Sequence, residues 1–382
     1  RGICNQQSVE ALEDFSQNAF DIPREVLANY SPEGGIFPQV ESREEVDVLE
    51  KIVQHPHIGD EGRSWFASPY MELRQSTDSD RLFEDQSLGE YPVIGGRNVF
   101  QFTHDSTFHE IEPPEYWSVA EDKNPEKSAK RRIREKKKKD VKNAIYESFE
   151  GSGSKRGFVN ELLEEHRGRP LSLDDVLLDC NEYRIVFRRI ANVKNERSFI
   201  ATVIPPGVVC HDGVYTIKPY SINPGQEDLN EGDLTSAYDR VFTDRELFSC
   251  LGLINSIPFD FLIRTKIDRT IPVYKFEESQ VPRLTEGDEW FDFISTRSAQ
   301  LNCYGDKFEE MRQRLGDLDP ALSRSKRRTL QAEIDAASFH AYGFNHKETA
   351  FVLDDFDKVK NPRIMDENYF DMVLEKYDEL AD

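Results

Sequence analysis

Apolar and polar positions repeat with two different periods along the chain, and these periods predict where helices and strands form. Helical spacing predicts one helix within residues 15–30 and another within residues 41–56. In the second stretch, Ser42 and Glu45 have the spacing of a capping box, which marks the start of a helix. The stretch 62–83 has no dominant period and predicts short strands.

Strand-like alternation dominates the middle of the chain. Residues 91–106 predict a strand, a glycine turn and a second strand. Residues 182–191 predict a further strand, in which one face carries Tyr183, Ile185 and Phe187 and the other carries Arg184, Val186 and Arg188. Additional strands are expected within residues 198–222.

Helical spacing returns after residue 243 and continues almost to the end. The stretch 243–263 is interrupted at Pro258, and an amphipathic helix is expected over residues 320–344, ending near Gly343. Two shorter helical pieces follow. The predicted fold class is therefore α/β (mixed α+β), with short strands followed by a helical C-terminal region.

Length and composition add three expectations. The chain has 382 residues, enough for two or three domains, and no run of 18 apolar residues that would predict a membrane span. A basic leader followed by an apolar run is absent, so we expect a cytoplasmic protein. Because the sequence begins with Arg1 rather than Met, we also expect a fragment or the second half of a longer protein.

The cysteines are scattered and odd in number, and none forms a CxxC pair. This spacing favours neither a zinc site nor a disulfide framework, so no metal site is predicted and a reducing compartment is expected. The cysteines are Cys4, Cys180, Cys210, Cys250 and Cys303.

Charge is distributed unevenly. The formal net charge is −23, yet residues 123–142 hold eleven Lys or Arg and three Asp or Glu, a net of +8. A diffuse acidic surface with few lysines elsewhere suggests a high-salt (halophilic) cytoplasm, in which strong net charge keeps a protein soluble. The alternative is that the protein is simply acidic.

The basic run within residues 123–142 predicts a contact with nucleic acid, because a lysine cluster is costly in an acidic chain unless an anion uses it. A solvated helix face or a flexible linker is the alternative, and Gly151–Ser154 has the composition of a flexible joint.

Six stretches of the chain, in order, resemble the C-terminal half of the large adenine-specific DNA methyltransferases of restriction-modification and phage-defence systems. Each motif is weak, but the likeness spreads over almost the whole chain. The stretches are SPEGGIFPQVESREEVDVLEKI, YMELRQSTDSDRLF, YPVIGGRNVFQFTHD, YRIVFRRIANVKNERSFIATVIPPG, LGLINSIPFDFLIRTKI and LQAEIDAASFHAYGFNHKETAFVLDDF.

The catalytic motif of that family is absent. Adenine-N6 methylation uses an N/D-P-P-Y/F motif to hold the flipped base, and Ile204–Gly207 and Asn223–Gly225 do not fit it. A glycine-rich loop that would cradle S-adenosylmethionine is also missing. The resemblance thus implies that catalysis and S-adenosylmethionine binding belong to a missing methylase half. This chain is expected to hold no cofactor and no catalytic residue, and to recognise the target sequence in double-stranded DNA.

The resemblance also implies a division into four regions. They are the tail of the methylase core and a connecting region (1–90), a first recognition segment with a basic linker (91–156), a target-recognition domain (157–300) and a helical C-terminal region (301–382).

Candidate DNA contacts are cations that could neutralise phosphates, arginines that could read guanine, and polar tips suited to base edges. Each has a structural alternative: a linker, a loop histidine, an Arg–Glu surface network or a helix C-cap. The candidates are Gln101, His104, Lys130, Arg131, Arg132, Arg134, Lys136, Lys137, Lys138, Lys139, Arg184, Arg188, Arg189, Lys194, Arg197, Arg264 and Lys266.

Three functions therefore remain open. The first is the recognition part of one methyltransferase polypeptide, and the second is a free-standing specificity subunit that docks on a separate methylase or nuclease. The third is an acidic protein-interaction scaffold in which the lysine run is a linker. Salt-dependent DNA binding separates the first two from the third.

Overall fold

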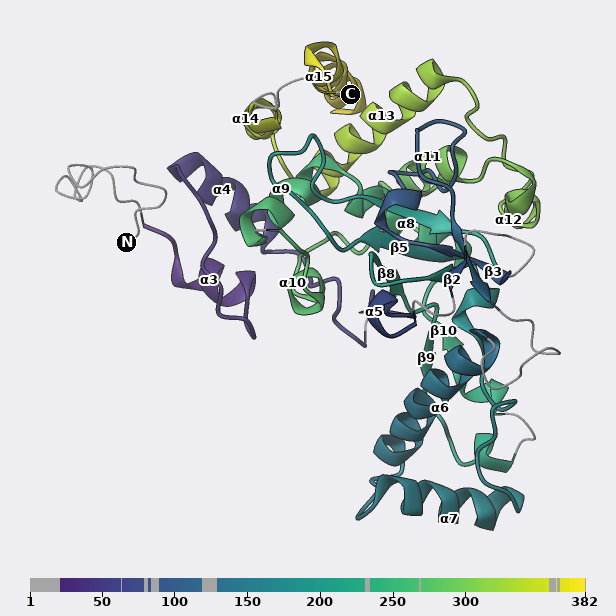
Figure 1. Ribbon diagram of the computed structural model, residues 1–382. Helices are drawn as coiled ribbons and strands as arrows, with labels where there is room; N and C mark the ends of the chain where they lie inside the picture. The colour runs from purple at the N-terminus through teal and green to yellow at the C-terminus, as the bar shows by residue number, and fades with distance from the viewer. Residues whose placement is uncertain are drawn as a thin grey trace.

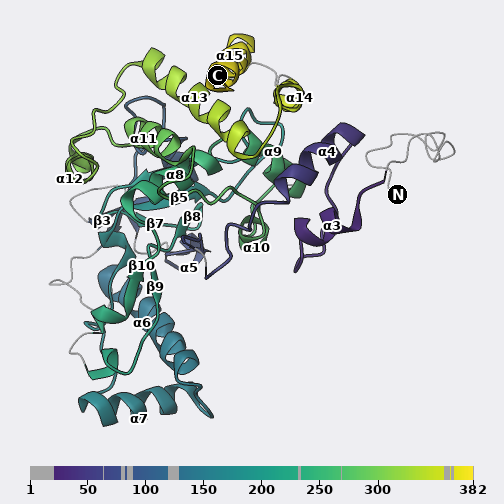
Figure 2. The ribbon, with the colours of Figure 1, turned by 180° about the vertical axis from the view of Figure 1, so that it is seen from behind.

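A computed structural model describes residues 21–62, 64–78, 82–83, 89–118, 129–230, 234–267, 269–356, 362 and 365–381. The fold is mixed α/β, as the sequence predicts. Small sheets lie in a body covered by helices, and a lobe containing α6 (Ala129–Ser148) and α7 (Lys155–Arg167) projects from it (Figures 1 and 2).

The central sheet is antiparallel, with the strand order β1-β8-β5-β6. Its inner strand β5 is covered on both faces, because Ile185 and Phe187 join one apolar cluster and Val186 joins another. The predicted strand is confirmed, and the side that carries Arg184 and Val186 is buried as well as the apolar side. The strands are β1 (Pro69–Tyr70), β8 (Val214–Ile217), β5 (Arg184–Arg188) and β6 (Ala201–Ile204).

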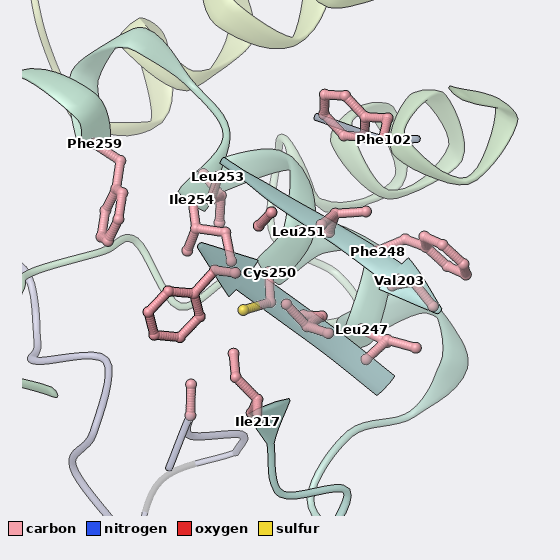
Figure 3. Packing of buried hydrophobic residues seen from close by; sticks show 14 of the residues in the cluster. Phe102, Val203, Ile217, Leu247, Phe248, Cys250, Leu251, Leu253, Ile254 and Phe259 are labelled. Atoms are coloured by element: carbon pink, nitrogen blue, oxygen red, sulfur yellow. The ribbon is translucent and has the colours of Figure 1, made fainter. Parts of the chain in front are cut away.

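Helix α8 (Asp244–Ile254) packs on this sheet, and its Leu247 and Leu251 gather with Val203 of β6 and Ile217 of β8 (Figure 3). Thr243 and Glu246 close a capping box at its start. Each such apolar side chain contributes about 1.5–3 kcal/mol when it leaves water.

The predicted interruption near Pro258 is confirmed as a break between α8 and α9 (Ile257–Lys266), with Pro258 in the first turn of α9. Among the described residues no single helix is long and apolar enough to cross a membrane. The α8–α9 pair, bent by 61°, passes the same test of length and composition.

A second apolar cluster joins the two ends of the described chain. Val46 and Leu49 of α4 pack with Phe339 of α13 and with residues of α14 and α15. The N-terminal and C-terminal regions expected from sequence thus share one core. The helices are α3 (Arg24–Tyr30), α4 (Arg43–Ile52), α13 (Arg324–Ala341), α14 (His346–Phe356) and α15 (Glu367–Ala381).

The lobe has its own small cluster, in which Val141 and Ile145 of α6 pack against Val159 and Leu163 of α7. The two-stranded sheet of β9 (Tyr220–Ile222) and β10 (Tyr238–Arg240) supports this cluster. The basic run is therefore helical where it is described, and residues 123–128 lie outside the described chain.

Several local expectations are confirmed by the structure. Ser42 accepts a hydrogen bond from the backbone N–H of Glu45, and α13 is followed by Gly343 with a φ of 74°. Of the helix expected in residues 15–30, the part before residue 21 lies outside the described chain. In residues 91–106 only the first strand forms, because a short 3₁₀ turn and a loop replace the second.

A third sheet has the order β2-β4-β3-β7, and only its β3–β7 pair is parallel. The remaining elements are α5 (Gln75–Asp78), β2 (Leu82–Phe83), β3 (Gly89–Ile94), β4 (Glu115–Ser118), β7 (Val209–Cys210), α10 (Val273–Glu277), α11 (Phe291–Asn302) and α12 (Glu309–Arg314), with 3₁₀ turns at Gly96–Asn98, Asp179–Asn181, Asp228–Asn230, Thr235–Ala237 and Asp306–Phe308.

Candidate nucleic-acid interface

The inner side of α6 attaches the lobe to the body. Lys137 is 3% exposed, and its Nζ lies 2.5 Å from a carboxylate oxygen of Asp179 and 5.0 Å from the ring centre of Tyr70. Lys136 donates a hydrogen bond to the backbone carbonyl of Glu72. The expected DNA contact of Lys137 is therefore wrong, because its ammonium group is enclosed by the body.

Three arginines of the same run have carboxylate partners. Arg132 lies 3.5 Å from Asp78, Arg134 lies 3.3 Å from Asp174, and Arg131 lies 3.2 Å from Glu135 in the next turn of α6. These pairs neutralise much of the positive charge that the sequence displays. The backbone of Lys130 is helical, and its side chain lies outside the described part.

The outer side of α6 keeps its charge. Lys138, Lys139 and Lys142 have no carboxylate partner among the described residues, and Lys142 lies near Lys138 and near Arg156 at the start of α7. Burial, followed by the charges of Lys138 and Arg156, lowers the pKa of Lys142. We call Lys138, Lys139, Lys142 and Arg156 the basic corner. It could neutralise phosphates.

Arg184 serves the fold. It is 1% exposed and donates hydrogen bonds to both carboxylate oxygens of Glu72, at 2.9 and 3.1 Å, and to the backbone carbonyl of Val208. Burial disfavours its charge most strongly, but Glu72 together with Cys210, Tyr70 and Cys180 outweighs burial and raises the pKa of Arg184. The expected DNA contact of Arg184 is therefore wrong, because its guanidinium group is buried and bonded to the protein itself.

Arg197 and Arg264 hold the loop that joins β5 to β6. Arg197 is buried and donates to Asp335 at 2.8 Å. Arg264 lies 3.9 Å above the ring centre of Phe356 and donates to the backbone carbonyls of Asn195 and Glu196 in that loop. Both were expected at the DNA, yet their guanidinium groups are engaged by the protein itself.

Lys266 is 2% exposed and joins α9 to the N-terminal arm. Its Nζ donates to the backbone carbonyls of Tyr30 and Glu278, at 2.8 and 2.6 Å. Burial lowers the pKa of Lys266 to about 7. This buried position contradicts the expected DNA contact of Lys266.

Gln101 and His104 also lie inside the protein. Gln101 is 4% exposed and donates to the backbone carbonyl of Asn255 at 3.1 Å. His104 stacks on Tyr304 with ring centres 4.6 Å apart, and burial lowers its pKa to about 4. An uncharged imidazole gives little attraction to phosphate. His104 lines a hollow of about 480 Å³ together with Asp105.

Arg188 and Arg189 lie together in a larger hollow of about 660 Å³, which we call the arginine hollow. Arg188 donates through Nε and Nη2 to the backbone carbonyl of Val99, at 3.1 and 2.6 Å, and burial lowers its pKa. The Arg189 guanidinium has no hydrogen-bond or carboxylate partner within the described residues. It is thus available to a ligand.

The rest of the hollow mixes donors with acceptors. Glu112, Glu115 and Asp212 line it, as do the side-chain amides of Gln75 and Asn195. One of the carboxylates is partly neutralised, since Arg97 lies 3.2 Å from Glu112. Base edges in the major groove present both donors and acceptors, so this lining suits bases better than it suits phosphates alone.

The basic helix begins beside this hollow. Gln75 lines the hollow and belongs to α5, and Asp78 of the same helix contacts Arg132 of α6. Lys194 is exposed on the β5–β6 loop, next to Asn195 of the hollow, and has no carboxylate partner among the described residues. Of the candidates, the structure therefore leaves Arg188 and Arg189 in the hollow, Lys194 on the adjoining loop, and Lys138 and Lys139 at the basic corner.

The sequence alone did not reveal the acidic partners of the buried cations, or several of the residues that line the arginine hollow. Glu72, Asp179 and Asp335 are far in sequence from the cations they bind, and no local pattern connects them. Gln75 and His211 line the arginine hollow only because the chain folds back there.

Within the described residues, no group of three or more His, Cys, Asp or Glu side chains is placed to hold a metal ion. The four described cysteines are free and buried. No protein-family model matches the chain, and no match was found among curated proteins.

Proposed function

We propose that this chain binds double-stranded DNA and recognises a target sequence for an adenine-N6 DNA methyltransferase of restriction-modification or phage defence. The methylase half, with its S-adenosylmethionine, belongs either to the same polypeptide or to a separate chain on which this one docks as a specificity subunit. The motif resemblance supports the methyltransferase part of the proposal, and the surface chemistry supports the DNA part.

The arginine hollow is the observation that carries the proposal. Most arginines of this acidic chain are used in ion pairs or hydrogen bonds, whereas the guanidinium group of Arg189 remains available beside that of Arg188. A guanidinium group can donate two hydrogen bonds to guanine, and neighbouring carboxylates and amides can bind cytosine and adenine. The basic corner adds attraction to phosphate at a second place.

A selection experiment tests sequence recognition. The chain would be incubated with a random duplex pool at several salt concentrations, bound duplexes would be sequenced, and affinities for an enriched duplex would be measured by fluorescence anisotropy. We expect Arg189→Gln to weaken binding by about 5- to 150-fold, the equivalent of about 1–3 kcal/mol, and to relax preference at one base pair.

Arg245→Gln is the matched control, because Arg245 at the start of α8 is exposed, is paired with Asp292 of α11 and does not line the arginine hollow. It should bind like the unchanged chain. The scaffold alternative predicts a different outcome, in which the chain binds no duplex at any salt concentration. That result, or binding without sequence preference and without an effect of Arg189→Gln, would overturn the proposal.

A further inference from the structure

The loop between β5 and β6 exposes two apolar side chains. Ile190 is 65% exposed and Val193 is 37% exposed, and Ile190 also lines the arginine hollow. Single exposed apolar residues are common on protein surfaces. Here, however, two of them share one loop with Lys194, directly after Arg188 and Arg189.

The loop is held in shape by its own backbone and by buried anchors. The backbone N–H groups of Lys194 and Asn195 donate to the side chain and to the carbonyl of Asn192, at 2.9 and 3.0 Å. Arg264 holds the carbonyls of Asn195 and Glu196 from below, and Arg197 is fixed by Asp335. Because the loop is already ordered, little conformational entropy is lost when it binds a ligand.

Arg269 adds a cation that the sequence did not suggest. Its backbone carbonyl accepts a hydrogen bond from Ala191, and the next residue, Thr270, bridges to Ile190. The Arg269 side chain is exposed and has no carboxylate partner among the described residues. Two cations, Lys194 and Arg269, thus lie near the exposed apolar side chains of this loop.

We propose that residues 190–195 enter the major groove of duplex DNA, with Ile190 against the bases and Lys194 and Arg269 on the flanking phosphates. This inference rests on the proposed DNA-binding function and adds the groove, the apolar contact and Arg269. The loop joins two antiparallel neighbours, and the major groove is wide enough to admit a two-stranded ribbon. Thymine methyl groups, which suit an aliphatic contact, also lie in that groove.

Disulfide cross-linking tests the position of Ile190. Ile190→Cys would be incubated with duplexes that carry a thiol tether on cytosine N4, in the major groove, or on guanine N2, in the minor groove. We expect cross-linking to the major-groove tether only. The unchanged chain and Leu322→Cys, whose site is 64% exposed on another loop, are the controls.

A salt titration tests Arg269 separately. Arg269→Gln should reduce the slope of log affinity against log salt by about 0.9, the value for a single phosphate contact, whereas Arg245→Gln should not. An Ile190→Ser change should lower affinity without changing that slope, because it removes no charge.

The outcomes distinguish this inference from the proposed function. If the chain binds duplex DNA but Ile190→Cys cross-links to neither tether, or only to the minor-groove tether, the loop inference is wrong and the proposed function stands. An unchanged salt slope in Arg269→Gln would remove Arg269 from the interface. If no duplex binds at all, both proposals fail.

Discussion

Buried ion pairs decide the role of many cations in this chain. A charge inside a protein is tolerated only with a partner of opposite sign or several hydrogen bonds. Glu72 and Asp335 are the partners of opposite sign for Arg184 and Arg197, and backbone carbonyls accept the hydrogen bonds of Lys266. The chain has 72 acidic residues against 49 Lys and Arg, so a carboxylate partner is easily found. The guanidinium group of Arg189 is informative for this reason, because it has no partner among the described residues.

The buried His104 makes stability depend on pH. Because its folded pKa is about 4, below the usual 6.5, the unfolded chain takes up a proton between these values that the folded chain does not. The free energy of unfolding should therefore fall by about 3 kcal/mol as the pH drops from 6.5 to 4. Urea denaturation of His104→Phe should show a shallower fall across this range.

The control for His104 is His346→Gln, which changes an exposed histidine on α14. It should retain the pH dependence of the unchanged chain. Equal pH dependence in His104→Phe and the unchanged chain would show that His104 does not cause the fall in the free energy of unfolding.

At the scale of the element, α6 has two sides with different tasks. Lys137 and the arginines of its first half pair with carboxylates, and Lys136 donates to the backbone carbonyl of Glu72. By contrast, Lys138, Lys139 and Lys142 have no carboxylate partner among the described residues. One run of like charges in the sequence therefore contains both cations that stabilise the fold and cations that remain available to a ligand. Changing Lys136 to Lys139 together would disturb both the attachment of the lobe and any phosphate contact.

Separate variants of α6 should show these two tasks. Lys137→Met leaves the Asp179 carboxylate buried with the Tyr70 hydroxyl but without its ammonium partner, and should lower the free energy of unfolding by about 3–5 kcal/mol. The triple change of Lys138, Lys139 and Lys142 to Gln should leave the melting temperature nearly unchanged and reduce the salt slope of DNA binding by about 0.9 for each lysine that touches a phosphate. Denaturant unfolding and anisotropy measure the two effects.

An unaltered salt slope in the triple variant would exclude the basic corner from DNA binding. A Lys137→Met variant as stable as the unchanged chain would instead contradict the structural role of that lysine.

At the scale of the molecule, the net charge of −23 opposes both compaction and the approach of DNA. Salt screens this repulsion, but it also weakens phosphate contacts. If the chain binds DNA in a high-salt cytoplasm, as proposed, it must therefore depend more on contacts with the bases. The mixed donors and acceptors of the arginine hollow, with Ile190 beside them, agree with that requirement.

The halophilic hypothesis predicts a thermal response. Raising KCl from about 0.1 M to about 2 M should increase the melting temperature, because the repulsion among unpaired carboxylates is screened. Differential scanning calorimetry at constant pH measures this shift. A melting temperature that does not rise would favour the simpler view of an acidic protein without adaptation to salt.

The sequence by itself determined the features that depend on neighbours a few residues apart. Helix caps at Ser42 and Thr243, the break near Pro258 and the strand at β5 follow from local hydrogen bonds and apolar spacing. Only the tertiary structure decided which cations are available to a ligand, because Arg184 and Arg197 meet carboxylates 112 and 138 residues away. Burial makes such long-range pairs necessary, and the same folding places Arg189 in its hollow with no partner in the part of the chain that the structure describes.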